Sequence, residues 1–139
     1  MKNTLCPGVG ESRRIVVDET RTISFMGEAL RVYATPWMVS DMEYACRDLI
    51  FHHLDEGEDS VGVRVEIEHL APTSLGEWVD IAVTVTAIDG RRVTLDFEAH
   101  DAAEVVGRGC HTRFVVDMAM AERRLSEKAA QLHRNSQNI

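Results

Sequence analysis

Apolar residues recur at helical spacing between Pro36 and about Leu54, which predicts one long amphipathic helix. Thr35 and Pro36 favour a helix start at this point, because threonine is a good N-cap and proline fits the first helical turn. The predicted apolar stripe consists of Met38, Val39, Met42, Ala45, Cys46, Leu49 and Ile50. The other side of the helix is expected to carry the polar residues Ser40, Asp41, Arg47, Asp48 and His52. Trp37, Tyr44 and Phe51 also lie on that side, so we expect most of the helix circumference to be covered by other parts of the protein.

After a turn-rich acidic loop at 56–60, the hydrophobic period changes from about 3.6 to 2, and four strand-like runs follow. One face of each of the first three runs is apolar: Val61, Val63, Val65 and Ile67; Val79, Ile81, Val83 and Val85; Val93, Leu95, Phe97 and Ala99. Asp89-Gly90 predicts a hairpin between the second run and the third. The fourth run, Val105 to Val116, contains Gly107 and Gly109, which indicates a bulge or a close backbone approach.

The rest of the chain adds a short strand at 13–17 and a helix from Met118 to about His133, followed by a frayed tail. Residues 21–34 show no clear hydrophobic period, so the sequence predicts no helix or strand for them. This segment could cover a site as a lid. A buried helix followed by a consecutive antiparallel meander predicts an α+β fold in which the sheet wraps the helix. We expect residues 1–139 to form a single domain with a partly polar outer sheet face.

Charge and cysteine content narrow the classes of function. The formal net charge of −8 argues against a nucleic-acid surface, which needs clustered Lys and Arg. No stretch is apolar enough to predict a membrane span, and the first residues lack the apolar core of a signal peptide, so we expect a cytoplasmic protein with no membrane partner. The three cysteines are widely spaced, which predicts free thiols, no metal site and no cofactor.

Two charged or titratable residues lie where apolar side chains are expected. Glu43 borders the apolar stripe of the predicted helix, and a partly desolvated carboxylate suits a general base or nucleophile. The simpler alternative is a border glutamate paired with Arg47 four residues later. His69 continues the apolar phase of its strand and therefore points inward, where it needs a partner; a satisfied core imidazole is the alternative.

Thr35 is the third candidate, either as a plain N-cap or as a hydroxyl that assists chemistry. The helix start beside it presents unpaired N–H groups, a natural site for the oxyanion of a thioester. Gly62 could admit a ligand to the backbone, although strand glycines are often only packing features. A hydroxyl, a border carboxylate and an inward imidazole without a metal cluster or a phosphate loop suit acyl transfer or hydrolysis.

The segments that carry these residues resemble the fluoroacetyl-CoA thioesterase family of the hotdog superfamily. The likeness spans about Thr35 to Val116 and rests on TPWMVSDMEYAC, SVGVRVEIEHLAPT, DGRRVTLDFEAHD and GRGCHTRFVV. The family spacing is reproduced by Thr35, Glu43, Gly62, His69 and Arg113. Before Thr35 the chain departs from the family's phenylalanine-bearing lid and reads MGEALRVYAT, so the resemblance does not extend to fluoroacetyl specificity.

The resemblance implies a hotdog fold, a homodimer, and an acyl-CoA thioesterase acting on a small or medium acyl group. It further implies a catalytic triad of Thr35, Glu43 and His69 near the subunit interface, with Gly62 and Arg113 binding substrate and Arg113 meeting the CoA phosphates. Three alternatives stay open from the residues alone: a hotdog enoyl-thioester hydratase or dehydratase, a non-catalytic acyl-CoA binding protein, and a structural dimer.

Overall fold

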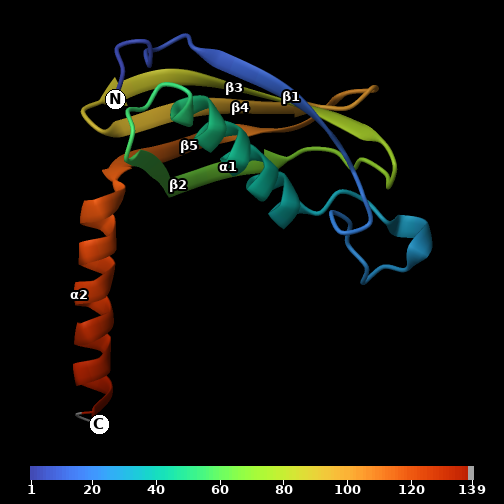
Figure 1. Ribbon diagram of the computed structural model, residues 1–139. Coiled ribbons are helices and arrows are strands. Elements are labelled where there is room, and N and C mark those ends of the chain that lie inside the picture. Colours follow the sequence, from blue (N-terminus) through green and yellow to red (C-terminus); the bar gives the residue numbers. More distant parts are fainter. Residues whose placement is uncertain (138–139) are drawn as a thin grey trace.

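A computed structural model describes residues 1–137 of the chain (Figure 1). Its elements follow in the order β1 (Gly10–Val16), the 3-10 turn η1 (Glu28–Leu30), α1 (Thr35–Phe51), β2 (Glu58–His69), β3 (Trp78–Asp89), β4 (Arg92–His100), β5 (Val105–Asp117) and α2 (Met118–Gln137). The strands form one antiparallel sheet that curves around α1. The predicted α+β architecture, with a sheet wrapped around one long helix, is thus present.

The strand order is β1-β3-β4-β5-β2, so the predicted consecutive meander is correct only for β3, β4 and β5. β2 pairs with β5 at one edge, and β1 pairs with β3 at the other. Asp89-Gly90 forms the predicted hairpin, with Gly90 at φ 61°. Residues 70–77 contain Pro72 and a turn, and they carry the chain from β2 across to β3 instead of folding it back. Alternation identifies strands, but their connections decide which strands pair.

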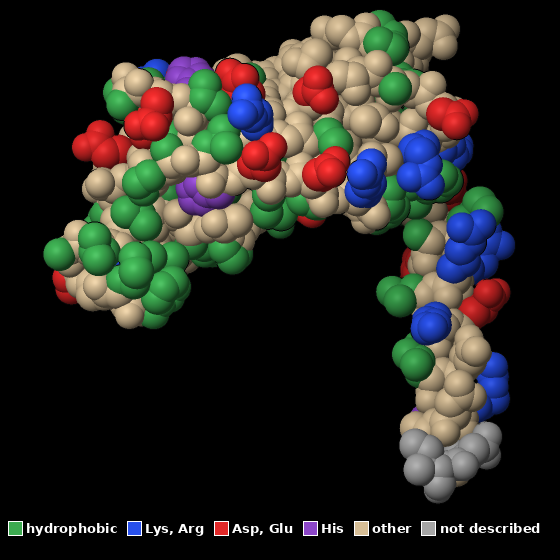
Figure 2. All heavy atoms as spheres, turned by 180° about the vertical axis from the view of Figure 1, so that it is seen from behind, with side chains coloured by type: hydrophobic (Ala, Val, Ile, Leu, Met, Phe, Trp, Pro, Cys, Tyr) green, Lys and Arg blue, Asp and Glu red, His purple; other side chains and the backbone are tan. Residues whose placement is uncertain are grey.

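The core lies between α1 and the facing side of the sheet. The predicted helix stripe is buried except at Val39, and the predicted apolar faces of β3 and β4 are buried along their whole length. The opposite sheet face is partly polar as expected, and Figure 2 shows charged side chains spread over it among hydrophobic ones. Its exposed residues include Arg64, Glu66, Glu68, Thr84 and Thr86.

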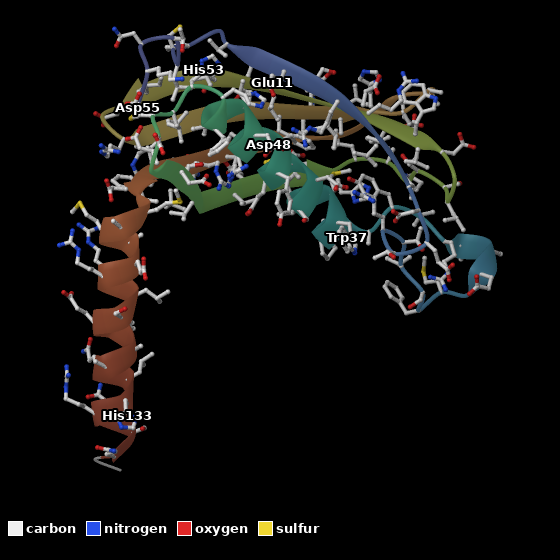
Figure 3. All side chains as sticks on the ribbon, viewed as in Figure 1. Glu11, Trp37, Asp48, His53, Asp55 and His133 are labelled. Carbon is white, nitrogen blue, oxygen red and sulfur yellow. The ribbon has the colours of Figure 1, made fainter. Side chains whose placement is uncertain are left out.

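Helix α1 differs from the prediction at its ends and on its outer side. Ala34 is the N-cap, so Thr35 is the first helical residue and makes no capping bond with its side chain. The helix ends at Phe51 rather than near Leu54. Trp37 projects away from the sheet (Figure 3), and Tyr44 is 65% exposed. The outer side of α1 was expected to be covered, but residues 1–137 of one chain leave these aromatic side chains open to solvent.

Asp41 was expected among exposed polar residues, yet it is buried. Arg21 donates two hydrogen bonds of 2.9 Å to its carboxylate, and the hydroxyl of Tyr33 donates a third. Burial and the bond to Asp41 raise the pKa of Tyr33, which keeps the phenol protonated. A helix period alone assigns Asp41 to the polar side, because it contains no information about an arginine twenty residues earlier. This ion pair anchors the segment before α1 to the helix.

A β-bulge corrects the predicted face of β2. The pairing with β5 shifts between Gly62 and Arg64, which leaves Val63 as the extra residue. The bulge reverses the side-chain phase, so Gly62 faces α1 before it, and Ile67 and His69 face α1 after it. Val61 therefore lies on the opposite face and is 49% exposed. The inward direction predicted for His69 is correct, although the alternation does not run unbroken from Val61.

The end of the chain forms a helix that extends away from the sheet (Figure 1). α2 begins as predicted at Met118 and continues to Gln137, beyond the predicted end near His133. Its side chains are exposed or partly exposed throughout. The last part of the predicted tail, residues 138–139, lies outside the described residues. Within the described part of the chain, no helix is both long and apolar enough to cross a membrane.

Candidate active site

Thr35 and His69 meet at the start of α1. The hydroxyl oxygen of Thr35 lies 2.7 Å from Nδ1 of His69, a strong hydrogen bond between the helix start and the end of β2. The Tyr33 ring lies edge-on to the imidazole at 6.1 Å between ring centroids, and so limits its rotation. The other ring nitrogen, Nε2, is buried and has no hydrogen-bonding partner among residues 1–137. The imidazole is thus oriented by Thr35 and keeps one nitrogen unused.

A pocket of about 390 Å³ opens beside this pair. Its wall is apolar apart from the threonine, the histidine and the buried tyrosine: Ile23, Phe25, Val32, Tyr33, Thr35, His69, Leu70, Ala71 and Pro72. The segment 21–34, left unassigned from the sequence, supplies one side of the pocket. Phe25, which belongs to this segment, is 82% exposed. Such a wall accepts an apolar group and offers no partner for a charged one.

The start of α1 offers fewer backbone donors than the sequence suggested. Pro36 has no N–H, and the N–H of Trp37 already donates to the carbonyl of Ala34 at 3.0 Å. The Thr35 N–H is therefore the donor of the first turn that has no acceptor among the described residues. The predicted oxyanion site is reduced to this one N–H within a single chain.

Glu43 belongs to a second cluster, built by α1, β2 and β5. A Cβ placed on Gly62 would lie 3.5 Å from Oε1 of Glu43, 3.5 Å from Nη1 of Arg113 and 3.1 Å from Cε1 of His111. The Glu43 carboxylate accepts no hydrogen bond from residues 1–137. Arg47, its expected partner, instead bonds Asp59 and Asp48. The missing side chain at Gly62 thus lets His111, Arg113 and the uncommitted Glu43 carboxylate approach one another closely.

Arg113 lies in the interior, 6% exposed, rather than on the surface. Its Nε donates to the hydroxyl of Ser60 at 2.8 Å and its Nη2 to the Ser60 carbonyl at 2.7 Å. Burial lowers its pKa, and the nearby charge of Glu43 opposes that shift. This buried position favours an electrostatic effect of Arg113 on Glu43 over contact of Arg113 with the phosphates of CoA.

His111 is a site residue that the sequence analysis did not identify. It is completely buried on β5, opposite Val65, and its Nε2 lies 3.1 Å from Nη1 of Arg113. The sequence does contain a pattern that could have identified it. Every second residue of the predicted strand lies on one face, and these residues are Gly107, Gly109, His111 and Arg113. A charged and a titratable residue in phase with two glycines indicate an occupied, polar part of the core.

The structure therefore gathers the five predicted site residues into two clusters, Thr35 with His69 and Glu43 with Gly62 and Arg113. Thr35 and Glu43 are eight residues apart on one helix, which separates them by about 12 Å along its axis. The two clusters therefore lie about two helical turns apart along α1. Among residues 1–137, no group of three His, Cys, Asp or Glu side chains could hold a metal ion.

We expect the protein to lose stability as the pH falls from 7.5 to 5.5. Burial is the main cause that lowers the pKa of His69 and of His111 from 6.5, so both stay neutral in the folded state where the unfolded chain already takes up protons. The unfolded state then binds more protons, and the free energy of unfolding decreases with falling pH by at most about 1.4 kcal/mol per pH unit for each group.

Urea midpoints measured across this pH window test the expectation. His111→Gln, which cannot titrate, should show a weaker pH dependence than the wild type. The exposed substitution His133→Gln on α2 serves as the control and should leave the dependence unchanged. A midpoint that does not change between pH 7.5 and 5.5 in the wild type would contradict the assignment of these two imidazoles as neutral.

Comparison with known proteins agrees with this fold. Residues 17–119 match the family described as fluoroacetyl-CoA-specific thioesterase. A fluoroacetyl-CoA thioesterase of Streptantibioticus cattleyicolor is 32% identical over 97 residues, which are 70% of this chain and 70% of that protein.

Solved structures give the same picture. A hot-dog-like protein from Thermanaerovibrio acidaminovorans has 32% identity and a TM-score of 0.82, with 88% of this chain and 91% of that chain covered. A mutant of the fluoroacetyl-CoA-specific thioesterase has 28% identity and a TM-score of 0.83, with 91% and 99% covered. These similarities confirm the predicted hotdog fold.

Proposed function

Because this chain belongs to the fluoroacetyl-CoA-specific thioesterase family, we propose that it hydrolyses an acyl-CoA thioester with Thr35, Glu43 and His69 as its working residues. It is a thioester hydrolase of the hotdog fold. The observation that carries the residue assignment is the hydrogen bond between Thr35 and an inward imidazole whose second nitrogen has no partner. Both groups open onto the apolar pocket.

The acyl group is proposed to occupy the pocket beside Phe25, with its carbonyl next to the N–H of Thr35. The pocket volume of about 390 Å³ and its apolar wall support a small or medium uncharged acyl group. The thioester carbonyl would then lie at the start of α1, where the positive end of the helix dipole stabilises developing negative charge.

Glu43 supplies the base or the nucleophile in this proposal. It either takes a proton from water, whose oxygen then bonds to the carbonyl carbon, or attacks that carbon itself and forms an anhydride that water hydrolyses. The C–S bond breaks in both routes, and the leaving sulfur takes a proton to give free CoA. His69, neutral because burial lowers its pKa, exchanges a proton with the Thr35 hydroxyl, which passes it to or from the water or leaving group.

A homodimer would bring the two clusters together. β2 is an edge strand of the sheet, and its exposed residues Val61, Val63 and Val65 leave an apolar border with unpaired backbone groups. A second copy that pairs with this edge would extend the sheet symmetrically. We propose that Glu43 of one copy then completes the site formed by Thr35 and His69 of the other.

A cytoplasmic location stays a proposal, supported by the three free thiols.

Thiol release from a panel of acyl-CoAs tests the proposed reaction, with short, branched, aryl and long acyl groups compared at equal concentration. We expect release from small and medium uncharged acyl groups, and a loss of about 100-fold in kcat in His69→Ala. Hydration of an enoyl-CoA without thiol release would identify a hydratase instead. A rise in melting temperature with acyl-CoA but no turnover of any substrate would identify a binding protein.

A further inference from the structure

His111 has both ring nitrogens committed in the interior of the molecule. Nδ1 lies 2.8 Å from the backbone carbonyl oxygen of Arg64, which can only accept, so Nδ1 carries the proton. Nε2 lies 3.1 Å from Nη1 of Arg113, which can only donate, so Nε2 is the acceptor. The two partners together select one neutral tautomer of the imidazole.

This tautomer completes the set of acceptors around Arg113. The guanidinium donates from Nε and Nη2 to Ser60 and from Nη1 to His111, and each of these acceptors is uncharged. The charge of Arg113 is therefore left to act on its surroundings, and Glu43 is the acidic side chain with the largest effect on it. A planar guanidinium fixed at three N–H groups keeps its charge near Glu43 without a hydrogen bond to that carboxylate.

We propose that His111 is a positioning residue for catalysis, which acts through Arg113 to hold the carboxylate of Glu43 in place. This inference rests on the proposed function of Glu43. His111 does not contact the reacting thioester in this arrangement. Two hydrogen bonds link the Arg64 carbonyl, His111 and Arg113, and the step from Arg113 to Glu43 is the attraction between their charges. The missing side chain at Gly62 leaves the space in which these groups meet.

The arrangement holds only while Nε2 is unprotonated. The groups that face the ring are Arg113 from β5, Glu43 from α1, the Arg64 carbonyl from β2 and the uncharged Leu95 from β4. A second proton on the ring would remove the acceptor for Arg113 and place two cations next to each other. Acid should thus release Arg113 and weaken turnover.

Two variants of similar size separate positioning from packing. His111→Gln can accept from Arg113 with its oxygen, donate to the Arg64 carbonyl with its amide, and cannot titrate. His111→Leu fills the space but leaves Nη1 of Arg113 without an acceptor. We expect kcat within about threefold of wild type for the glutamine variant, and a loss of about 30-fold in kcat with little change in KM for the leucine variant.

The pH dependence gives a second readout that packing alone would not move. The fall of kcat/KM at acid pH should shift to lower pH in His111→Gln. A folded leucine variant with kcat near that of the wild type would overturn the proposal, as would a glutamine variant as inactive as the leucine one. Absence of thiol release from the wild type would instead count against the proposed function.

Nitrogen NMR of histidine-labelled wild-type protein tests the hydrogen-bond chain without any substrate, and also if the leucine variant fails to fold. We expect His111 to show a proton on Nδ1 and none on Nε2 at pH 7. A proton on Nε2 under these conditions would exclude the bond from Arg113 and overturn the proposal.

Discussion

Glu43→Gln should lower the rate of thiol release by about 1,000-fold, within the range for loss of a general base or nucleophile. Glutamine keeps the shape of the side chain and its place on the border of α1, but it can neither accept a proton nor attack a carbonyl. Glu43 makes no hydrogen bond within residues 1–137, so the substitution should leave the melting temperature within a few degrees of wild type. Thiol release and thermal unfolding, measured on the same preparation, check both halves of the expectation.

Glu68→Gln is the matched control, because Glu68 is exposed on β2 and undergoes the same chemical change. It should keep full activity. A Glu43→Gln variant that turns over like the wild type would remove Glu43 from the reaction and leave Thr35 and His69 as an incomplete site.

Mixed subunits show whether the site spans two chains. Glu43→Gln and His69→Ala, each inactive alone, should regain part of the wild-type activity when they are unfolded together and refolded as mixed dimers. In the mixed dimer one site would combine the intact Glu43 of one copy with the intact His69 of the other. If both residues served within one chain, each site would keep one defect, and mixing would restore nothing.

Much of the fold could be predicted because the governing patterns are local. The helical stripe that includes Met42 and Leu49, and the alternation along β3 and β4, are direct consequences of which side chains leave water. The Asp89-Gly90 hairpin depends on two adjacent residues. For the same reason Glu43 and His69 could be selected as candidates, since each interrupts an apolar pattern within its own element.

The remaining features depend on contacts between segments far apart in the chain. The burial of Asp41 needs Arg21 and Tyr33, and the pairing of β2 with β5 needs the crossover at 70–77. The bulge at Val63 has no signal in the alternation of β2 alone. Arg113 could be located on a strand from the sequence, but its interior position follows from the acceptors Ser60 and His111, which lie on two different strands.

Gly109→Ala should destabilise the protein by more than about 3 kcal/mol, the range of severe steric substitutions in a packed interior. A Cβ at this position would collide with the backbone carbonyl oxygen of Glu66 and lie 2.8 Å from the Cα of Ile67. Both atoms belong to the backbone of β2, which is paired to β5 along its length and cannot move without loss of that pairing. Urea unfolding of the variant and the wild type measures the change.

Gly107→Ala is the matched comparison, two residues earlier on the same face of β5. There a Cβ would lie 2.5 Å from Sδ of Met38, the far end of a flexible side chain that can change its rotamer. We expect a cost of about 1–2 kcal/mol for this variant. Equal losses in the two variants would show that close packing in general, and not the approach of the β2 backbone, requires glycine at 109. β2 also carries Gly62 and His69, so a Gly109→Ala variant that still folds should lose activity in proportion to the displacement of that strand. Gly107→Ala should instead retain the geometry of the Glu43 cluster.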